Sequence, residues 1–158
     1  MHFIGSLQTN KVRYVVERVS LIHSLDSLRL AAEIEKQAAA REKRMDVLAE
    51  INCAAETAKG GVLPQDAAEF CLSLSRFPHL RLAGFMTMAP KCDDPRDYIK
   101  YFSETYKLSI DIWRGKLHNN NEPVLSWGMS DSFEEAIATG ATIVRVGRKL
   151  FAPRDGDA

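Results

Sequence analysis

Two short segments in the last third of the sequence carry residues suited to holding a phosphate group. Segment 126–131 contains Gly128, which lets the backbone approach a ligand closely, and Ser130, which offers a hydroxyl. Segment 145–148 adds donors at Gly147 and Arg148. Arg145 lies two residues before Gly147, so both face the same side of an extended strand, where a guanidinium can contact a heterocyclic nitrogen or a carboxylate. Together the segments predict a phosphate cradle beside a cationic group.

A helix is expected directly after the first of these segments. Asp131, followed three residues later by Glu134, fits a capping box, and Gly140 is expected to end the helix. The free N–H groups and positive dipole end of such a helix favour an anion. This expectation places an additional anion-binding element beside Ser130.

Each of these residues also has a plainer interpretation. Gly128 and Ser130 are typical turn residues, and Arg145 can pair with an internal carboxylate. Lys11 can be a solvated surface side chain, and Lys59, followed by two glycines, can belong to a polar loop. The four histidines show no metal-ligand spacing, so no metal site is predicted; they are His2, His23, His79 and His118.

Six short apolar runs, several rich in Val and Ile, alternate with longer amphipathic segments. The runs cover residues 2–5, 19–23, 46–52, 82–88, 123–126 and 142–147. Short runs of this kind are typical of buried parallel strands. Besides the helix that follows Asp131, three helices are expected between them. The first is expected to be capped by Asp26 and to turn Leu30, Ile34 and Ala38 inward. The second has Pro64 in its first turn and Ala67, Phe70, Cys71 and Leu74 on its inward side. The third covers residues 98–117, with Tyr98, Phe102, Tyr106, Ile110 and Trp113 on one side.

Strand–helix alternation predicts an α/β fold with a parallel sheet. A doubly wound sheet and a barrel are both compatible with this alternation. The glycine-rich G-x-G-x-x-G turn that favours a dinucleotide-binding doubly wound sheet is absent from the sequence. In either fold the ligand site lies beyond the C-terminal ends of the strands, and in barrels a phosphate often binds after the seventh and eighth strands.

The composition excludes several classes of function. The chain has 158 residues with 21 basic and 21 acidic side chains, so it lacks the basic excess of a nucleic-acid-binding protein. Its three cysteines, Cys53, Cys71 and Cys92, form neither a disulfide framework nor a close metal-binding pair. No apolar run is long enough to span a membrane, and no signal peptide is recognisable, so a cytoplasmic protein is expected.

Taken in order, the strand ends closely resemble those of the pyridoxal-phosphate (PLP) homeostasis family, also called proline synthetase co-transcribed homologues. The segments that carry the resemblance correspond to the family's third to eighth strands. They are His2–Lys11, Ile22–Ser27, Asn52 with Lys59 and Gly60, Gly84–Pro90, Leu125–Asp131 and Val144–Arg148. The match extends from residue 2 to about residue 154.

The resemblance implies a (β/α)8 barrel of the alanine racemase N-terminal type, present here as about six of eight β/α units. It implies that residues 1–158 are a single PLP-binding domain that lacks its N-terminal part. By the resemblance, Ser130, Gly147 and Arg148 contact the phosphate, Arg145 contacts the pyridine nitrogen and Met129 lies beside the ring. Gly128 and Asn52 complete the predicted cofactor-binding set, and no catalytic residue is predicted.

The sequence departs from the family at the Schiff-base lysine, which the resemblance places on a strand before residue 2. Lys11 and Lys59 are therefore the candidate substitute amines. A barrel of six strands also leaves two strand edges unpaired, which predicts self-association through those edges.

Three functions remain open. The first is a non-catalytic PLP carrier or regulator of intracellular PLP homeostasis. The second is a cofactor-free structural or interaction module, and the third is a PLP-dependent racemase-like enzyme. An enzyme of the third kind would need a further acid or base, which is not recognisable in the sequence.

Overall fold

The fold is given by a computed structural model, which describes residues 1–56 and 60–151. Six strands form one sheet in the order of the sequence, and every neighbouring pair is parallel. The strands are β1 (His2–Phe3), β2 (Leu21–Leu25), β3 (Met45–Ile51), β4 (Leu80–Thr87), β5 (Val124–Met129) and β6 (Ile143–Arg145). The predicted parallel α/β fold with six strands is confirmed.

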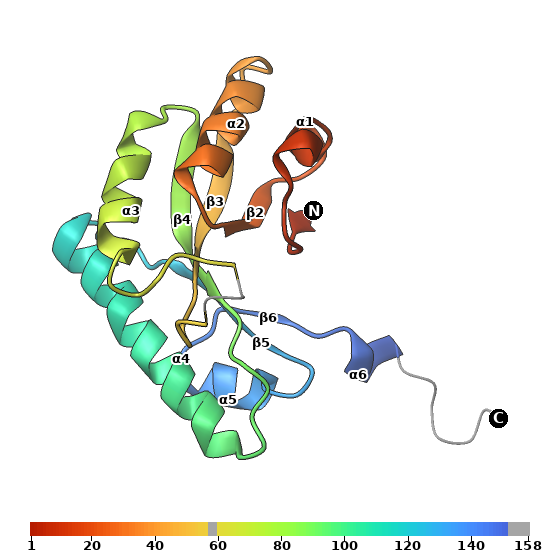
Figure 1. The fold of residues 1–158 in the computed structure, drawn as a ribbon, viewed down its shortest axis with the longest axis vertical. Helices are drawn as coiled ribbons and strands as arrows, with labels where there is room; N and C mark the ends of the chain where they lie inside the picture. Colours follow the sequence, from red (N-terminus) through yellow and green to blue (C-terminus); the bar gives the residue numbers. More distant parts are fainter. Residues whose placement is uncertain (57–59, 152–158) are drawn as a thin grey trace.

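The long helices cover one side of the sheet. Figure 1 shows α2, α3 and α4 along the outside of a curled half-barrel, with β1 and β6 at its two edges. The helices are α1 (Val12–Val15), α2 (Leu28–Ala39), α3 (Ala67–Ser73), α4 (Pro95–Ile110), α5 (Phe133–Ala138) and α6 (Arg148–Phe151). Short 3-10 turns cover Thr9–Lys11 and Leu74–Arg76, and a π-helical turn, Asp111–Lys116, follows α4. None of the helices in the part of the chain that the structure describes is long and apolar enough to cross a membrane.

Irregular strand pairing accounts for the curl of the sheet. The register shifts between β2 and β3, between β3 and β4, and between β5 and β6. Such irregularities increase the twist and bend of the strands that carry them. At Gly84 in β4 the backbone of β5 comes so close that an added Cβ would lie 2.0 Å from the Val124 carbonyl oxygen. Only glycine fits at this bend.

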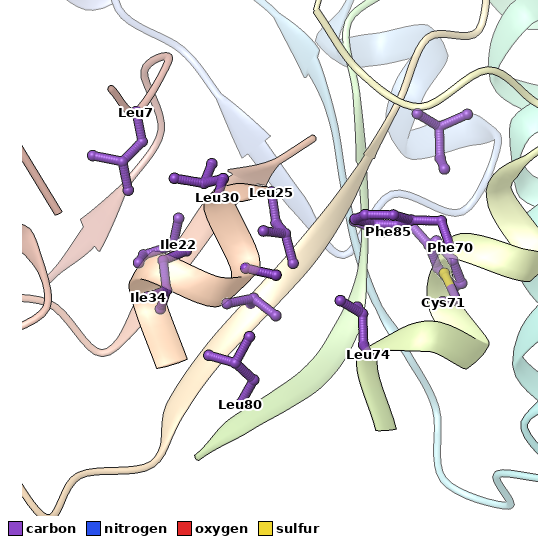
Figure 2. Close-up of a cluster of buried hydrophobic side chains, with 14 of the residues drawn as sticks. Leu7, Ile22, Leu25, Leu30, Ile34, Phe70, Cys71, Leu74, Leu80 and Phe85 are labelled. Atoms are coloured by element: carbon purple, nitrogen blue, oxygen red, sulfur yellow. The ribbon is translucent and has the colours of Figure 1, made fainter. Parts of the chain in front are cut away.

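Most of the apolar core lies between the sheet and its helices. Figure 2 shows part of it, where Leu30 and Ile34 of α2 and Phe70 of α3 pack over the outer face of the strands. A smaller cluster, built on Leu21, Leu48 and Met86, fills the concave inner face. Because successive strand residues alternate between faces, the polar residues of the inner face lie above this second cluster, toward the C-terminal ends of the strands.

The predicted inward stripes of α2 and α3 are confirmed, since all of their residues are buried: Leu30, Ile34, Ala38, Ala67, Phe70, Cys71 and Leu74. The predicted starts of these two helices differ from those in the structure. Ser27, not Asp26, caps α2 by accepting a hydrogen bond from the Leu30 N–H at 3.3 Å. Pro64 lies in a turn, and α3 begins three residues later, at Ala67.

The predicted third helix was partly wrong. It begins at Pro95, and its buried residues are Tyr98, Phe102, Thr105 and Ser109, which leaves Tyr106 beside the stripe and 41% exposed. Ile112 and Trp113 of the π-helical turn after Ile110 are buried. The predicted capping box after β5 was also wrong. Helix α5 starts at Phe133 without a side-chain cap, because the Asp131 carboxylate accepts a hydrogen bond from Arg148 at 2.6 Å instead.

Candidate functional site

A cavity of about 540 Å³ lies at the C-terminal ends of the strands, on the β5–β6 side of the barrel mouth. This volume falls within the usual range for small-molecule sites. Its lining comes from the two edge strands, from β2 and from the loops after β4 and β5: His2, Ile4, His23, Met88, Met129, Ser130 and residues 143–148. Five residues of the predicted cofactor site therefore border a single cavity: Met129, Ser130, Arg145, Gly147 and Arg148.

Arg145 is fixed by three hydrogen bonds. Its Nη1 donates to the Ser126 carbonyl oxygen at 2.8 Å and to Ser126 Oγ at 2.7 Å, and its Nη2 donates to the Thr87 carbonyl oxygen at 3.0 Å. A guanidinium has five N–H donors, so two remain for a ligand. Burial lowers the pKa of Arg145 from its usual value, but an arginine stays charged at neutral pH. The sequence placed Arg145 on the inner face correctly but did not reveal this clamp.

Two histidines extend the Arg145 network across the barrel. His23 Nδ1 lies 2.9 Å from Ser126 Oγ, and His23 Nε2 lies 3.2 Å from His2 Nδ1. Ser126 Oγ accepts from Arg145, and in the His23 tautomer that carries its proton on Nε2 the Ser126 proton is donated to His23 Nδ1. His23 in turn donates from Nε2 to His2. In this arrangement each group donates a hydrogen bond to the next, in the order Arg145, Ser126, His23 and His2.

The electrostatics of His23 agree with this neutral tautomer. Burial, then the neighbouring His2 and then Arg145 lower the pKa of His23 to about 4. A neutral His23 can serve as the acceptor for Ser126 throughout the neutral pH range. The arrangement can therefore hold a permanent cation in place without adding a second charge beside it.

Ser130 and Gly147 form the part of the cavity suited to a phosphate. Ser130 is buried, and its Oγ accepts one long hydrogen bond, 3.4 Å, from the Lys149 N–H. No atom lies within 4 Å of the Cβ position at Gly147, so the main chain is open there. Within the described ranges, the N–H groups of Gly147 and Arg148 donate to no protein acceptor. These donors resemble an anion-binding nest.

Arg148 and Met129 border the cavity with exposed side chains. The Arg148 guanidinium donates to the Asp131 carboxylate at 2.6 Å and is 79% exposed. Met129 is 46% exposed. Both can reach a ligand that enters from solvent, but neither is held rigidly by the fold.

Gly128 and Asn52 have structural contacts of their own and are not part of the cavity lining. Gly128 has φ of +87°, and a Cβ there would lie 2.4 Å from Ala136 Cβ, so glycine is required for packing against α5. The Asn52 side chain donates to the Glu56 carbonyl oxygen at 2.8 Å and accepts from the Glu56 N–H at 3.2 Å, holding the loop after β3. Their predicted contact with a ligand stays a prediction.

The two candidate amines also lie away from the described lining. Lys11 ends the short turn after β1, is exposed, and does not border the cavity. Lys59 lies outside the residues that the structure describes. Over residues 1–56 and 60–151 there is no group of three or more His, Cys, Asp or Glu side chains arranged to hold a metal ion.

Sequence reasoning missed four polar residues of the barrel interior. His2 and His23 were dismissed for lack of metal-ligand spacing, Ser126 was taken only as part of a strand, and Glu50 was not singled out. A signal was present for three of them. His23, Glu50 and Ser126 are polar residues within otherwise apolar runs, and polar residues are seldom fully buried unless they have partners.

Comparison with known families agrees with this geometry. The family described as "Alanine racemase, N-terminal domain" matches residues 1–155. This chain belongs to the alanine racemase N-terminal domain family. The family was predicted from the order of the strand-end motifs, and that prediction is confirmed.

Two curated relatives of this family member carry the name pyridoxal phosphate homeostasis protein. The protein of Aquifex aeolicus (strain VF5) is 44% identical over 153 residues, which cover 97% of this chain and 66% of that protein. The protein of Escherichia coli (strain K12) is 36% identical over 155 residues, which cover 98% of this chain and 64% of that protein. The chain thus spans slightly less than two-thirds of the length of these relatives.

Solved structures of the family show the same architecture. PipY of Synechococcus elongatus PCC7942, solved without PLP, superimposes with a TM-score of 0.86 at 28% identity, covering 96% of this chain and 70% of that chain. A second structure of PipY, with PLP bound, gives a TM-score of 0.84. Alanine racemase of Clostridium difficile 630, at 17% identity and a TM-score of 0.75, shares the fold.

Proposed function

We propose that this chain binds pyridoxal 5′-phosphate in the cavity on the β5–β6 side of the barrel mouth, as a non-catalytic carrier in intracellular PLP homeostasis. The observation that carries the proposal is the clamped Arg145, with two N–H donors left over, beside the open donors at Ser130 and Gly147. The names of the relatives and the PLP-bound PipY structure support the same ligand.

The donor set fits both ends of this cofactor. Ser130 Oγ and the N–H groups of Gly147 and Arg148 would hold the phosphate, since each can donate a hydrogen bond. Arg145 would face the pyridine nitrogen. A permanent cation there disfavours protonation of that nitrogen, so the nitrogen accepts a hydrogen bond from the guanidinium. Met129 would cover the ring from the solvent side.

The cofactor, when bound, supplies an aldehyde that reacts reversibly with amines. By the family resemblance, the lysine that bonds this aldehyde belongs to a strand before residue 2, which leaves Lys11 and Lys59 as candidates within this chain. The contribution of the chain's own residues is therefore to bind and orient. Arg145, held by Ser126 and Thr87, would orient the ring, and Ser130 would hold the phosphate.

A PLP titration tests the proposal. The purified chain would be titrated with PLP while its absorption spectrum and melting temperature are recorded, before and after borohydride reduction, and any adduct would be located by peptide mass. Thermal stabilisation, with or without a reducible adduct at Lys11 or Lys59, is the expected result. A chain that shows neither stabilisation nor a specific adduct contradicts PLP binding and favours the cofactor-free module.

Two variants and a matched control localise the binding. Arg145→Met and Ser130→Ala are each expected to weaken PLP binding, Arg145→Met by about 100-fold, because charge-assisted contacts are lost. Arg96→Met removes an arginine that pairs with Asp94 on the surface at the start of α4 and is expected to change nothing. Equal affinity for PLP in Arg145→Met and Arg96→Met would place the cofactor elsewhere.

We propose three further features. The whole chain is taken as one domain, and the protein is taken as cytoplasmic. Strands β1 and β6 are the sheet edges, with two and three residues, and self-association would occur through them. Sedimentation velocity at several protein concentrations tests this last point, since a concentration-independent monomer contradicts it.

A further inference from the structure

A second cavity lies beyond the ends of β1, β2 and β3. It measures about 500 Å³ and is formed by the loops that follow β1, β2 and β3. Its lining is mostly polar: Ser6, Leu7, Gln8, Thr9, Asp26, Ser27, Arg29, Leu30, Gly60 and Gly61. None of these residues borders the cavity at β5 and β6.

Two carboxylates lie close to Gly60, which borders this cavity, and one of them, Asp26, is part of the cavity lining. An added Cβ at Gly60 would lie 3.7 Å from Asp26 Oδ2 and 4.0 Å from Glu50 Oε1, so both oxygens border the same point. Glu50 is on β3 and only 8% exposed, and Asp26 is half-buried in the loop after β2. Glu50 is not part of the described cavity lining, but its Oε1 reaches the edge of the cavity at Gly60.

Neither carboxylate accepts a hydrogen bond from the residues that the structure describes. In the described parts of the chain, no side chain and no main-chain N–H donates to Asp26 or Glu50, and neither forms an ion pair within 4.0 Å. A buried carboxylate without a donor is unfavourable. Arg29, the basic residue of the lining, is exposed, and solvent screens its charge.

We propose that this cavity, which we call the Glu50–Asp26 pocket, binds the primary ammonium group of a small organic amine. An ammonium carries one positive charge and three N–H donors. The two carboxylates at Gly60 would take the charge and two of the donors, and the hydroxyls of Ser6 and Thr9 in the lining are acceptors of the right kind for the third. The proposal does not depend on PLP binding, because the two cavities share no lining residue.

The protonation of Glu50 adds a pH dependence to this binding. Burial first, and the nearby Asp26 second, raise the pKa of Glu50 to about 7, while Arg145 acts in the opposite direction. Near neutral pH the pair therefore holds a proton for part of the time. A bound ammonium would displace that proton, so binding is expected to tighten as the pH rises through 7.

The test uses propylammonium as the probe and amide NMR shifts as the measurement, with no PLP present. Shifts at Gly60, Gly61 and the residues around Asp26 are expected to saturate at millimolar propylammonium, and more readily at pH 8 than at pH 6. Neither 1-propanol, which lacks the charge, nor tetramethylammonium, which lacks N–H donors, is expected to produce them. Equal shifts with 1-propanol would overturn the proposal.

Three variants separate charge from shape. Glu50→Gln and Asp26→Asn keep the side-chain size and are each expected to weaken propylammonium binding at least tenfold. Gly60→Ala keeps both charges but places a methyl group between the carboxylates at ordinary contact distance, and it should block the site without disturbing the fold. Glu104→Gln, on the exposed side of α4, is the control for net charge and should bind as the original chain does.

Unchanged binding in Glu50→Gln and Asp26→Asn would overturn the proposal even if the probe binds somewhere on the protein. A PLP titration of Glu50→Gln keeps the two sites distinct. Loss of amine binding with retained PLP binding supports a separate pocket. Loss of amine binding together with PLP binding would mean that the variant perturbs the whole barrel mouth, which contradicts two independent sites.

Discussion

On the β5–β6 side of the barrel mouth, Arg145, Ser126 and His23 are joined by hydrogen bonds. On the β2–β3 side, Glu50 and Asp26 both lie close to Gly60 and accept no hydrogen bond from the described residues. The first side is organised before any ligand arrives, so its geometry is available to an aromatic, anionic molecule at little further expense in free energy. The second side is complementary to a cation. One barrel mouth thus contains two regions of opposite electrostatic character.

The two regions also make the free energy of unfolding depend on pH in opposite directions. The folded chain keeps His23 neutral down to about pH 4, whereas an unfolded histidine takes up a proton near 6.5, so stability from His23 increases as the pH rises from 4 to 6.5. The folded chain keeps Glu50 protonated up to about pH 7, whereas an unfolded glutamate loses its proton near 4.5, so stability from Glu50 decreases as the pH rises from 4.5 to 7. Between pH 4.5 and 6.5 the two effects oppose each other.

The largest expected effect comes from Glu50→Gln. At pH 8 this variant should increase the free energy of unfolding by roughly 3 kcal/mol, because the pKa of the buried carboxylate is raised from about 4.5 to about 7. At pH 4.5 the difference from the original chain should nearly vanish. Urea denaturation at both pH values measures this, and an equal difference at the two pH values would show that Glu50 is not the responsible titrating group.

His23→Asn should reveal the pH dependence that Glu50 alone gives to the stability of the folded chain. Asparagine can still accept a hydrogen bond from Ser126 but does not titrate, so only the effect of Glu50 remains. The free energy of unfolding of this variant should therefore fall by roughly 2–3 kcal/mol as the pH rises from 4.5 to 7. The profile of the original chain should be flatter over the same range. The measurement is a series of denaturation curves across this range. An unchanged profile would mean that His23 and Glu50 do not compensate each other.

Ser126→Ala breaks the link between His23 and Arg145. The free energy of unfolding is expected to fall by about 1–2 kcal/mol, because His23 Nδ1 loses its donor and Arg145 Nη1 loses one of two acceptors. PLP affinity should fall about tenfold by the same loss of positioning. Ser103→Ala, at an exposed position on α4, is the matched control. If Ser126→Ala matches that control in PLP affinity, the clamp does not position Arg145.

Arg148→Ala should have the smallest effect on stability. Its ion pair with Asp131 is exposed, so its loss should change the free energy of unfolding by less than about 1 kcal/mol. PLP affinity should nevertheless fall several-fold if Arg148 contacts the phosphate. Spectroscopic titration of this variant decides the point, and unchanged affinity would leave Ser130 and Gly147 as the phosphate donors.

Most of the fold was predictable from the sequence because it depends on patterns that repeat along the chain. Apolar runs gave all six strands, and the inward stripes of α2 and α3 followed from helical spacing. The end of α4 was mispredicted because the π-helical turn at Asp111–Lys116 changes the spacing locally. The cap of α5 was mispredicted because Asp131 has a tertiary partner, Arg148, that local sequence does not reveal.

Only the phosphate side of the site could be predicted from the sequence, because only that side depends on local patterns. Glycines, serine and arginines at strand ends indicated the phosphate side, where each residue type has a local meaning. The Glu50–Asp26 pocket depends on two residues 24 positions apart that become neighbours only when β2 and β3 pair and the following loop brings Gly60 between them. Spacing along the chain carries no signal of that encounter.

The shortness of β1 has a consequence for motion. This strand pairs with β2 through only His2 and Phe3, so its amide hydrogens should exchange with solvent by local opening, well before those of β3 or β4. Each opening would remove His2 as the last acceptor of the hydrogen-bonded series, while Arg145 stays bonded to the carbonyl oxygens of Ser126 and Thr87. The same hydrogen-bonded series therefore connects the central strand β4, through the Thr87 carbonyl oxygen, with the short edge strand β1.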